Sequence, residues 1–170
     1  LSADVDALRC AIVKRARDPE MVLGEVAKMR LRIQAAKHAQ IWDGKLGAGR
    51  LQDIELIGQA GLLGSGSIER DIEAGLQSCV ALGWMSDAQS AALVRSYRLF
   101  WSMQIATKLL SETVIDDSAM PGAIGQGGLA FLLRETGFES LEKMRAGIAE
   151  TQANASKALS DVLPDIGEDE

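Results

Sequence analysis

Apolar residues recur at intervals of three and four along almost the whole chain, and no strand-length run of β-branched residues interrupts them. This spacing places the apolar side chains on one face of an α-helix. Aromatic residues make up only 4% of the sequence, and alanine and leucine, which both favour helices, dominate the apolar content. The sequence therefore predicts an all-α fold, an antiparallel bundle of about six to seven helices.

Capping residues, prolines and glycines divide this pattern into segments. The expected helices run from Ser2 to about Arg17, Pro19 to about Ala39, about Arg50 to the segment Gly64-Ser65-Gly66, Ser67 to Gly83, Asp87 to about Ser111, Gly128 to Gly137, and Leu141 to Pro164. Ser86 and Gln89 have the spacing of a capping box. Residues 1–164 are expected to form one helical domain, and residues 165–170 an acidic, disordered tail.

Two further packing features are predicted. Gly58 and Gly61 lie inside an expected helix, where glycine costs about 1 kcal/mol, so another helix is expected to approach closely there. Four residues are expected to mark the buried face of the long helix after Ser86: Val94, Tyr97, Trp101 and Ile105.

Polar residues crowd together between Asp43 and Gln59, a segment called the central motif below. A glycine-rich loop carrying Lys45 and Arg50 runs directly into a helix that opens with Asp53 and Glu55. Two interpretations stay open. In the first, the two carboxylates stabilise the helix N-terminus and pair with Lys45 or Arg50.

In the second, the loop and the first helical turn form one wall of a nucleotide cleft. Lys45 and Arg50 then face phosphates. The polar stripe of Gln52, Glu55 and Gln59 faces a base, a ribose or a catalytic domain.

Several kinds of chemistry are excluded for the chain alone. The single histidine, His38, rules out a serine or cysteine triad, and no metal role is expected for it. The phosphate-loop pattern is absent, because Lys45 precedes the glycines. Asp53 and Glu55 diverge by about 200° on a helix, so they cannot chelate one ion together. Asp116 and Asp117 are expected to be solvated. We therefore predict no catalytic and no metal-binding residue.

Charge and composition limit the partners and the compartment. The net charge of −6 argues against nucleic acid as a partner. No run approaches the roughly 20 apolar residues of a membrane span. Cys10 and Cys79 lack C-x-x-C spacing and are expected to be buried, reduced thiols of a cytoplasmic protein. Because the sequence begins at Leu1, we expect it to be a piece of a longer protein.

The central motif resembles the segment K-x-G-x-G-G-[IL]-x-[DE]-I-E-F-x-x-Q of bacterial glutamine synthetase adenylyltransferases. The matching residues are Lys45, Gly47, Gly49, Leu51, Asp53, Ile54, Glu55 and Gln59. Three positions depart: Gly44, where a β-branched residue is common, Arg50, where a second glycine is usual, and Leu56, where phenylalanine is usual. Residues 68–110 also resemble this family in their helix-turn-helix layout.

The resemblance implies a function for the longer protein. The family's enzymes transfer AMP from ATP to a tyrosine of glutamine synthetase with Mg²⁺, and a separate domain reverses the modification. Glutamine and the PII signalling protein control the balance. The metal-binding carboxylates belong to a preceding nucleotidyltransferase domain with a G-[ST]-x-x-D-x-D motif, which is absent here.

The resemblance thus implies that this chain is the C-terminal helical domain of such an enzyme, inactive by itself and binding neither ATP nor Mg²⁺ alone. Its position implies service to the adenylylating activity. Five residues are expected to face nucleotide or a domain interface: Lys45, Arg50, Asp53, Glu55 and Gln59. The alternative is a non-catalytic protein–protein interaction module, whose last helix, with its heptad pattern, binds a partner.

Overall fold

The computed structural model describes residues 2–36 and 40–166, and every regular element among them is a helix. The elements are α1 (Ser2–Val13), α2 (Pro19–Ala36), α3 (Leu51–Ser65), α4 (Ile72–Ala81), α5 (Asp87–Leu110), the short 3-10 helix η1 (Asp117–Ala119), α6 (Gly125–Thr136) and α7 (Leu141–Val162). The predicted all-α class is therefore confirmed for the part of the chain that the structure describes.

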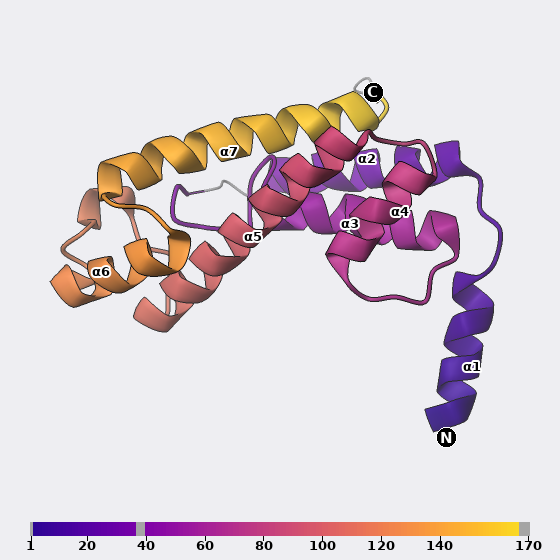
Figure 1. The fold of residues 1–170 in the computed structure, drawn as a ribbon, viewed down its shortest axis with the longest axis horizontal. Coiled ribbons are helices and arrows are strands. Elements are labelled where there is room, and N and C mark those ends of the chain that lie inside the picture. The colour runs from indigo at the N-terminus through magenta and orange to yellow at the C-terminus, as the bar shows by residue number, and fades with distance from the viewer. Residues whose placement is uncertain (1, 37–39, 167–170) are drawn as a thin grey trace.

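Helices α5 and α7 run along the molecule and connect two hydrophobic clusters (Figure 1). The first cluster joins α2, α3 and α4 to the first half of α5 and the second half of α7; its buried residues include Ile54, Leu76, Leu93 and Leu159. The second joins the loop before α3 to the second half of α5, to α6 and to the first half of α7; it includes Trp42, Phe100, Leu132 and Met144. The loop that carries the central motif lies where the two clusters meet.

The helix ends agree with the expected caps at three places. Ser86 and Gln89 form the predicted capping box at the start of α5. Gly66 and Gly137, with φ of 68° and 77°, close α3 and α6 in the left-handed conformation that glycine adopts without strain.

Three predicted helix ends are wrong. Helix α6 begins at Gly125 rather than at Gly128. Helix α1 ends at Val13, not near Arg17, because the Arg17 guanidinium donates hydrogen bonds to the carbonyls of Ile12, Val13 and Arg15 and closes the turn. Helix α4 begins at Ile72 and not at Ser67, because its N-cap is Asp71. The Asp71 carboxylate accepts a hydrogen bond from the Glu73 amide at 2.7 Å.

Helices α3 and α4 cross closely at glycine, as predicted. A Cβ added to Gly58 would lie 2.9 Å from Cγ2 of Ile72, and one added to Gly61 would lie 2.5 Å from Sγ of Cys79. Such separations are far inside van der Waals contact, so the crossing depends on the missing side chains. The close approach also buries Cys79 completely.

The predicted buried face of α5 is wrong. Trp101 is 48% exposed and Ile105 is also exposed, whereas Leu93, Phe100 and Met103 are fully buried. The true core face is turned by about one residue, 100°, from the aromatic stripe that the sequence suggested.

The apolar stripe of the last helix, α7, packs inside the domain. Met144, Ile148, Ala155 and Ala158 are all buried in the two clusters. A partner protein therefore cannot dock on this face of α7 in the folded domain. At the end of the chain, Ile166 packs against the first cluster. Residues 167–170 of the predicted tail lie outside the described residues, and so does His38.

Candidate functional site

The glycine-rich loop of the central motif is wedged between α5 and α7. A Cβ on Gly44 would lie 2.5 Å from the carbonyl oxygen of Phe100 in α5. A Cβ on Gly49 would lie 2.7 Å from the backbone nitrogen of Ser156 in α7, and Gly49 also has a φ of +74°. Both positions therefore require glycine, because a larger residue would push a helix backbone away. The loop is held between two rigid elements.

Arg50 closes this wedge from inside. Its Nε and Nη2 donate to Oε1 of Gln152 at 3.2 and 3.0 Å, and its Nη1 donates to the carbonyls of Gln40, at 2.6 Å, and Asp43. The guanidinium also lies 5.7 Å from the ring centroid of Phe100. The residue is 4% exposed, and this burial lowers the pKa of Arg50, although Asp43 partly offsets the shift.

Glycine is usual at position 50 in the family that the central motif resembles. The backbone conformation of Arg50 explains why this position tolerates a residue with a side chain. Its φ is −98° and its ψ is −174°, so it has the extended conformation of a helix N-cap, which any residue adopts. The positive φ values of the loop fall on Gly47 and Gly49 instead. In this conformation Arg50 does not face a surface ligand.

Asp53 is the second buried charge of the motif, also 4% exposed. Its Oδ2 accepts from the Gly49 amide at 2.9 Å, from Nε of Arg30 at 2.9 Å and from Nε2 of Gln34 at 3.3 Å. The expectation that it pairs with Lys45 or Arg50 is wrong, because its ionic partner is Arg30 of α2. Asp53 therefore ties the loop and α3 to α2.

The other three predicted residues are less deeply buried. Lys45 and Gln59 are exposed, and Glu55 is half-buried. Burial raises the pKa of the Glu55 carboxyl, and the nearby Lys45 ammonium lowers it in part. Lys45 is thus near enough to Glu55 to influence its carboxyl, and neither residue shares the deeply buried environment of Arg50 and Asp53.

Helix α5 adds an aromatic pair beside Glu55 that the sequence did not assign to a surface. The rings of Tyr97 and Trp101 stack with centroids 6.0 Å apart. Burial raises the pKa of the Tyr97 hydroxyl, and the nearby carboxylates of Glu55, Asp71 and Glu73 raise it further. Glu55 therefore lies close enough to interact with both Lys45 and Tyr97. We call the four residues Lys45, Glu55, Tyr97 and Trp101 the outer face.

Three residues that anchor the loop were missed. Trp42 donates from Nε1 to Oδ1 of Asp117 at 3.0 Å, and Arg145 pairs with the same carboxylate at 2.8 Å while lying 5.5 Å from the Trp42 ring centroid. Asp117 is exposed, as expected, and its carboxylate also binds the loop. These partners are 75 and 28 residues apart in sequence, so no local pattern signals them.

Across residues 2–36 and 40–166, no three His, Cys, Asp or Glu side chains gather closely enough to hold a metal ion. Within the same ranges no helix has both the length and the apolar character to cross a bilayer. Both thiols are free. Cys79 is buried as expected, and burial raises its pKa to about 12, whereas Cys10 is only half-buried.

Three bacterial proteins are similar to nearly the whole chain, and each is named a bifunctional glutamine synthetase adenylyltransferase/adenylyl-removing enzyme. The protein of Xanthobacter autotrophicus is 24% identical over 98% of this chain, that of a Bradyrhizobium species 26% over 95%, and that of Rhodopseudomonas palustris 28% over 90%. No protein-family model and no solved structure matches the chain.

The chain spans only about one sixth of the length of these curated relatives, 16 to 17%. The similarity therefore concerns one segment of a much longer enzyme. The resemblance first seen in the central motif is confirmed along nearly the entire sequence: this chain is similar to a segment of bifunctional glutamine synthetase adenylyltransferase/adenylyl-removing enzymes.

Proposed function

We propose that this chain is a helical accessory domain of an enzyme that adenylylates and deadenylylates glutamine synthetase, and that its outer face meets the nucleotide-bearing catalytic domain. The observation that carries the proposal is the division of the central motif. Arg50 and Asp53 are committed inward, while Lys45 and Glu55 of the same motif remain available at the surface.

The buried residues of the central motif hold the backbone that carries Lys45 in place. Lys45 belongs to a loop held by α5 and α7 through Gly44 and Gly49, and its backbone amide donates to Oδ1 of Asp43 at 2.9 Å. The backbone beside the ammonium is thus fixed before any ligand arrives, which lowers the entropy lost on binding. A lysine on a rigid loop suits a phosphate oxygen as a point charge.

The remaining parts of the reaction belong to the longer protein in this proposal. ATP and Mg²⁺ are bound by a nucleotidyltransferase domain, glutamine synthetase is the protein substrate, and a PII protein regulates the enzyme. Lys45 would contribute charge at the nucleotide phosphates, and Glu55 would keep the ammonium directed along the outer face. In this proposal neither Lys45 nor Glu55 transfers a proton or binds a metal.

The test is Lys45→Ala in the full-length enzyme, with Lys108→Ala as the matched control, since Lys108 is an exposed lysine on the same domain. We expect Lys45→Ala to raise the KM for ATP about tenfold, the effect of losing roughly 1.4 kcal/mol of a charged contact, and Lys45→Arg to restore most of the affinity. Lys108→Ala should leave KM unchanged.

Assaying adenylylation and adenylyl removal separately shows which activity the domain serves. We expect the effect on the adenylylating reaction. If Lys45→Ala leaves KM and kcat of both reactions at the values of the unaltered enzyme, the outer face does not contact the nucleotide and the proposal fails.

A further inference from the structure

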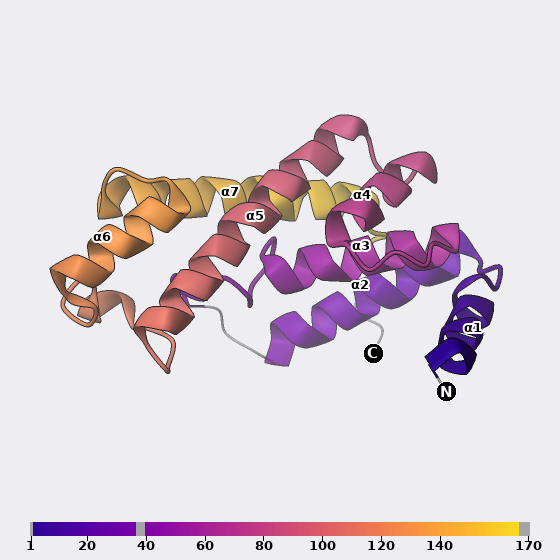
Figure 2. The ribbon, with the colours of Figure 1, turned by 60° about the horizontal axis from the view of Figure 1, so that its bottom comes forward.

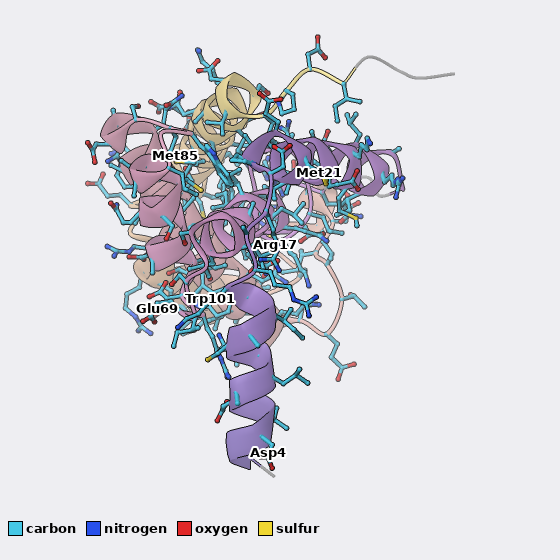
Figure 3. The ribbon with its side chains drawn as sticks, turned by 90° about the vertical axis from the view of Figure 1, so that its right-hand side faces the viewer. Asp4, Arg17, Met21, Glu69, Met85 and Trp101 are labelled. Carbon is cyan, nitrogen blue, oxygen red and sulfur yellow. The ribbon has the colours of Figure 1, made fainter. Side chains whose placement is uncertain are left out.

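Two aromatic side chains of α5 reach the surface beside the central motif, in a chain in which aromatic residues make up only 4%. Trp101 is exposed over 48% of its surface, and Tyr97 is half-buried. Their rings stack with centroids 6.0 Å apart and with an angle of 24° between the ring planes. Figure 3 shows Trp101 at the margin of the helical body rather than in its interior. The indole therefore offers an already ordered surface on which a flat apolar group can stack.

The loop that carries Lys45 packs directly on this part of α5. A Cβ added to Gly44, the residue before Lys45, would lie 3.0 Å from Cβ of Gln104 and 3.1 Å from its backbone nitrogen. Gln104 follows Trp101 by three residues, slightly less than one helical turn, so the two side chains are neighbours on the helix surface. The backbone of Lys45 therefore begins within about one helical turn of the aromatic pair.

The surroundings of Tyr97 are acidic. Burial raises the pKa of its hydroxyl, and the nearby carboxylates of Glu55 and Asp71 raise it further. The third carboxylate that acts on this hydroxyl, Glu73, is paired with Arg98. Glu55 and Asp71 therefore make this end of the outer face acidic. A phosphate group is favoured at the lysine of the loop and disfavoured at the aromatic pair, whereas an uncharged ring meets no such barrier.

The structure also leaves room for a ring beside the indole. Trp101 borders a cavity of about 160 Å³ between α5 and α6, which lie side by side (Figure 2). Ile105, Leu109 and Phe131 give this cavity largely apolar walls. Along α5, Trp101 thus lies between Tyr97, one turn before it, and Ile105, one turn after it. A flat ring that enters the cavity meets the indole, whose orientation the Tyr97 ring stabilises.

We propose that Trp101, supported by Tyr97, stacks on the base of the nucleotide whose phosphates meet Lys45. This inference rests on the proposed function, and it adds the residue that holds the uncharged end of the ligand. Stacking requires only the face of the base and no hydrogen bonds to its edges, so Trp101 contributes affinity for a nucleotide rather than selection of one base. The indole takes no part in the chemistry of the transfer.

Two inhibitors that each carry one part of ATP test the two ends of the site in the full-length enzyme. Adenosine has the base without phosphates, and tripolyphosphate has the phosphates without a base. We expect Trp101→Ala to weaken inhibition by adenosine at least about fivefold, the lower end of the effect of removing a stacking side chain, and to raise the KM for ATP by the same factor. Inhibition by tripolyphosphate should not change. Lys45→Ala should weaken inhibition by tripolyphosphate and leave adenosine unaffected.

Three further variants separate stacking from a purely structural role of Trp101. Trp101→Phe retains an aromatic ring and should keep most of the inhibition by adenosine. Trp101→Leu is apolar but has no ring, and it should lose as much as Trp101→Ala. The matched control is Leu31→Ala, because Leu31 of α2 is 46% exposed, almost as much as Trp101, and lies outside the outer face. It should leave inhibition by both compounds unchanged.

Three results overturn the stacking role: Trp101→Ala leaves the KM for ATP and inhibition by adenosine unchanged, Trp101→Leu behaves like Trp101→Phe, or Trp101→Ala weakens inhibition by both compounds equally. The last result would mean that Trp101 supports the fold or contacts the catalytic domain instead. A failure of the proposed function gives a different pattern, because Lys45→Ala then leaves inhibition by tripolyphosphate unchanged. The adenosine measurement still decides in that case whether Trp101 stacks on the base.

Discussion

Replacing Arg50 by alanine tests whether the buried residues of the central motif stabilise the fold. The change removes four hydrogen bonds to Gln152, Gln40 and Asp43 and leaves two backbone carbonyls at a site that is 4% exposed. A hydrogen bond to a charged group contributes about 1.5–3 kcal/mol, but the bonds of one guanidinium are not additive. Breaking a buried charged network typically costs about 3–5 kcal/mol. We expect a loss in that range.

Urea unfolding of the 170-residue chain measures this loss. With an m-value of about 1–3 kcal/mol/M, the midpoint should fall by at least about 1 M. Arg50→Lys retains the charge but cannot reach Gln152 and two carbonyls at once, so we expect an intermediate loss. In a double-mutant cycle with Gln152→Ala, the coupling between the two side chains should be about 0.5–3 kcal/mol.

Lys45→Ala is the matched control, because Lys45 is exposed on the same loop. Its stability should stay within about 0.5 kcal/mol of the unaltered chain. The reasoning is refuted if Arg50→Ala unfolds at the same urea concentration as Lys45→Ala, since the buried network would then contribute nothing to the fold.

Two further predictions follow from the glycine crossing and from Glu55. Gly61→Ala should lower the free energy of unfolding in urea by about 1–3 kcal/mol, because the added Cβ meets Sγ of Cys79. The control is Gly24→Ala on α2, where an added Cβ has nothing within 4 Å and should stabilise the chain by about 0.5–1 kcal/mol. Equal effects of the two substitutions would contradict the close crossing. The pKa of the Glu55 carboxyl is raised in the fold, so its ionisation opposes folding as pH rises through the unfolded-state value. Glu55→Gln should therefore stabilise the chain at pH 7 but not at a pH where the carboxyl is protonated in both states. Carboxyl NMR titration should show a still higher Glu55 pKa in Lys45→Ala, and an unchanged or lower value would exclude the Lys45–Glu55 interaction.

The sequence predicts the local features of this fold because those features have local causes. The capping box of Ser86 and Gln89 and the glycine at the end of α6 depend on residues within one or two turns. The crossing of α3 is predicted from the unfavourable glycines inside that helix, although the residues that meet them lie on α4. The choice of the buried face of α5 has no such local cause. Tyr97 and Trp101 have the spacing of a buried stripe, but Phe100 and Met103 are the residues that meet α6, α7 and the loop. Periodicity indicates that a helix has an apolar face, and tertiary packing decides which one is buried.

The central motif shows the same limit at the candidate site. Its composition correctly indicates a concentration of polar groups near a helix N-terminus, but it does not separate the buried charges from the exposed ones. Asp53 pairs with Arg30, which is 23 residues away, and Arg50 with Gln152, which is 102 residues away. Such partners carry no signature of their own, because a basic residue on α2 and a glutamine on α7 look like ordinary surface residues.

The arginine at position 50 connects the central loop to α5 and α7. Since its backbone φ is −98°, the loop conformation does not require glycine there, and a glycine would leave the inward carbonyls of Gln40 and Asp43 without this donor. The guanidinium joins these carbonyls to Gln152 on α7 and lies over Phe100 on α5, so one side chain contacts both helices that run the length of the domain. The backbone that carries Lys45 is therefore held against α5 and α7. If the outer face binds a catalytic domain, the binding energy acts on a rigid support rather than being lost in ordering a flexible loop.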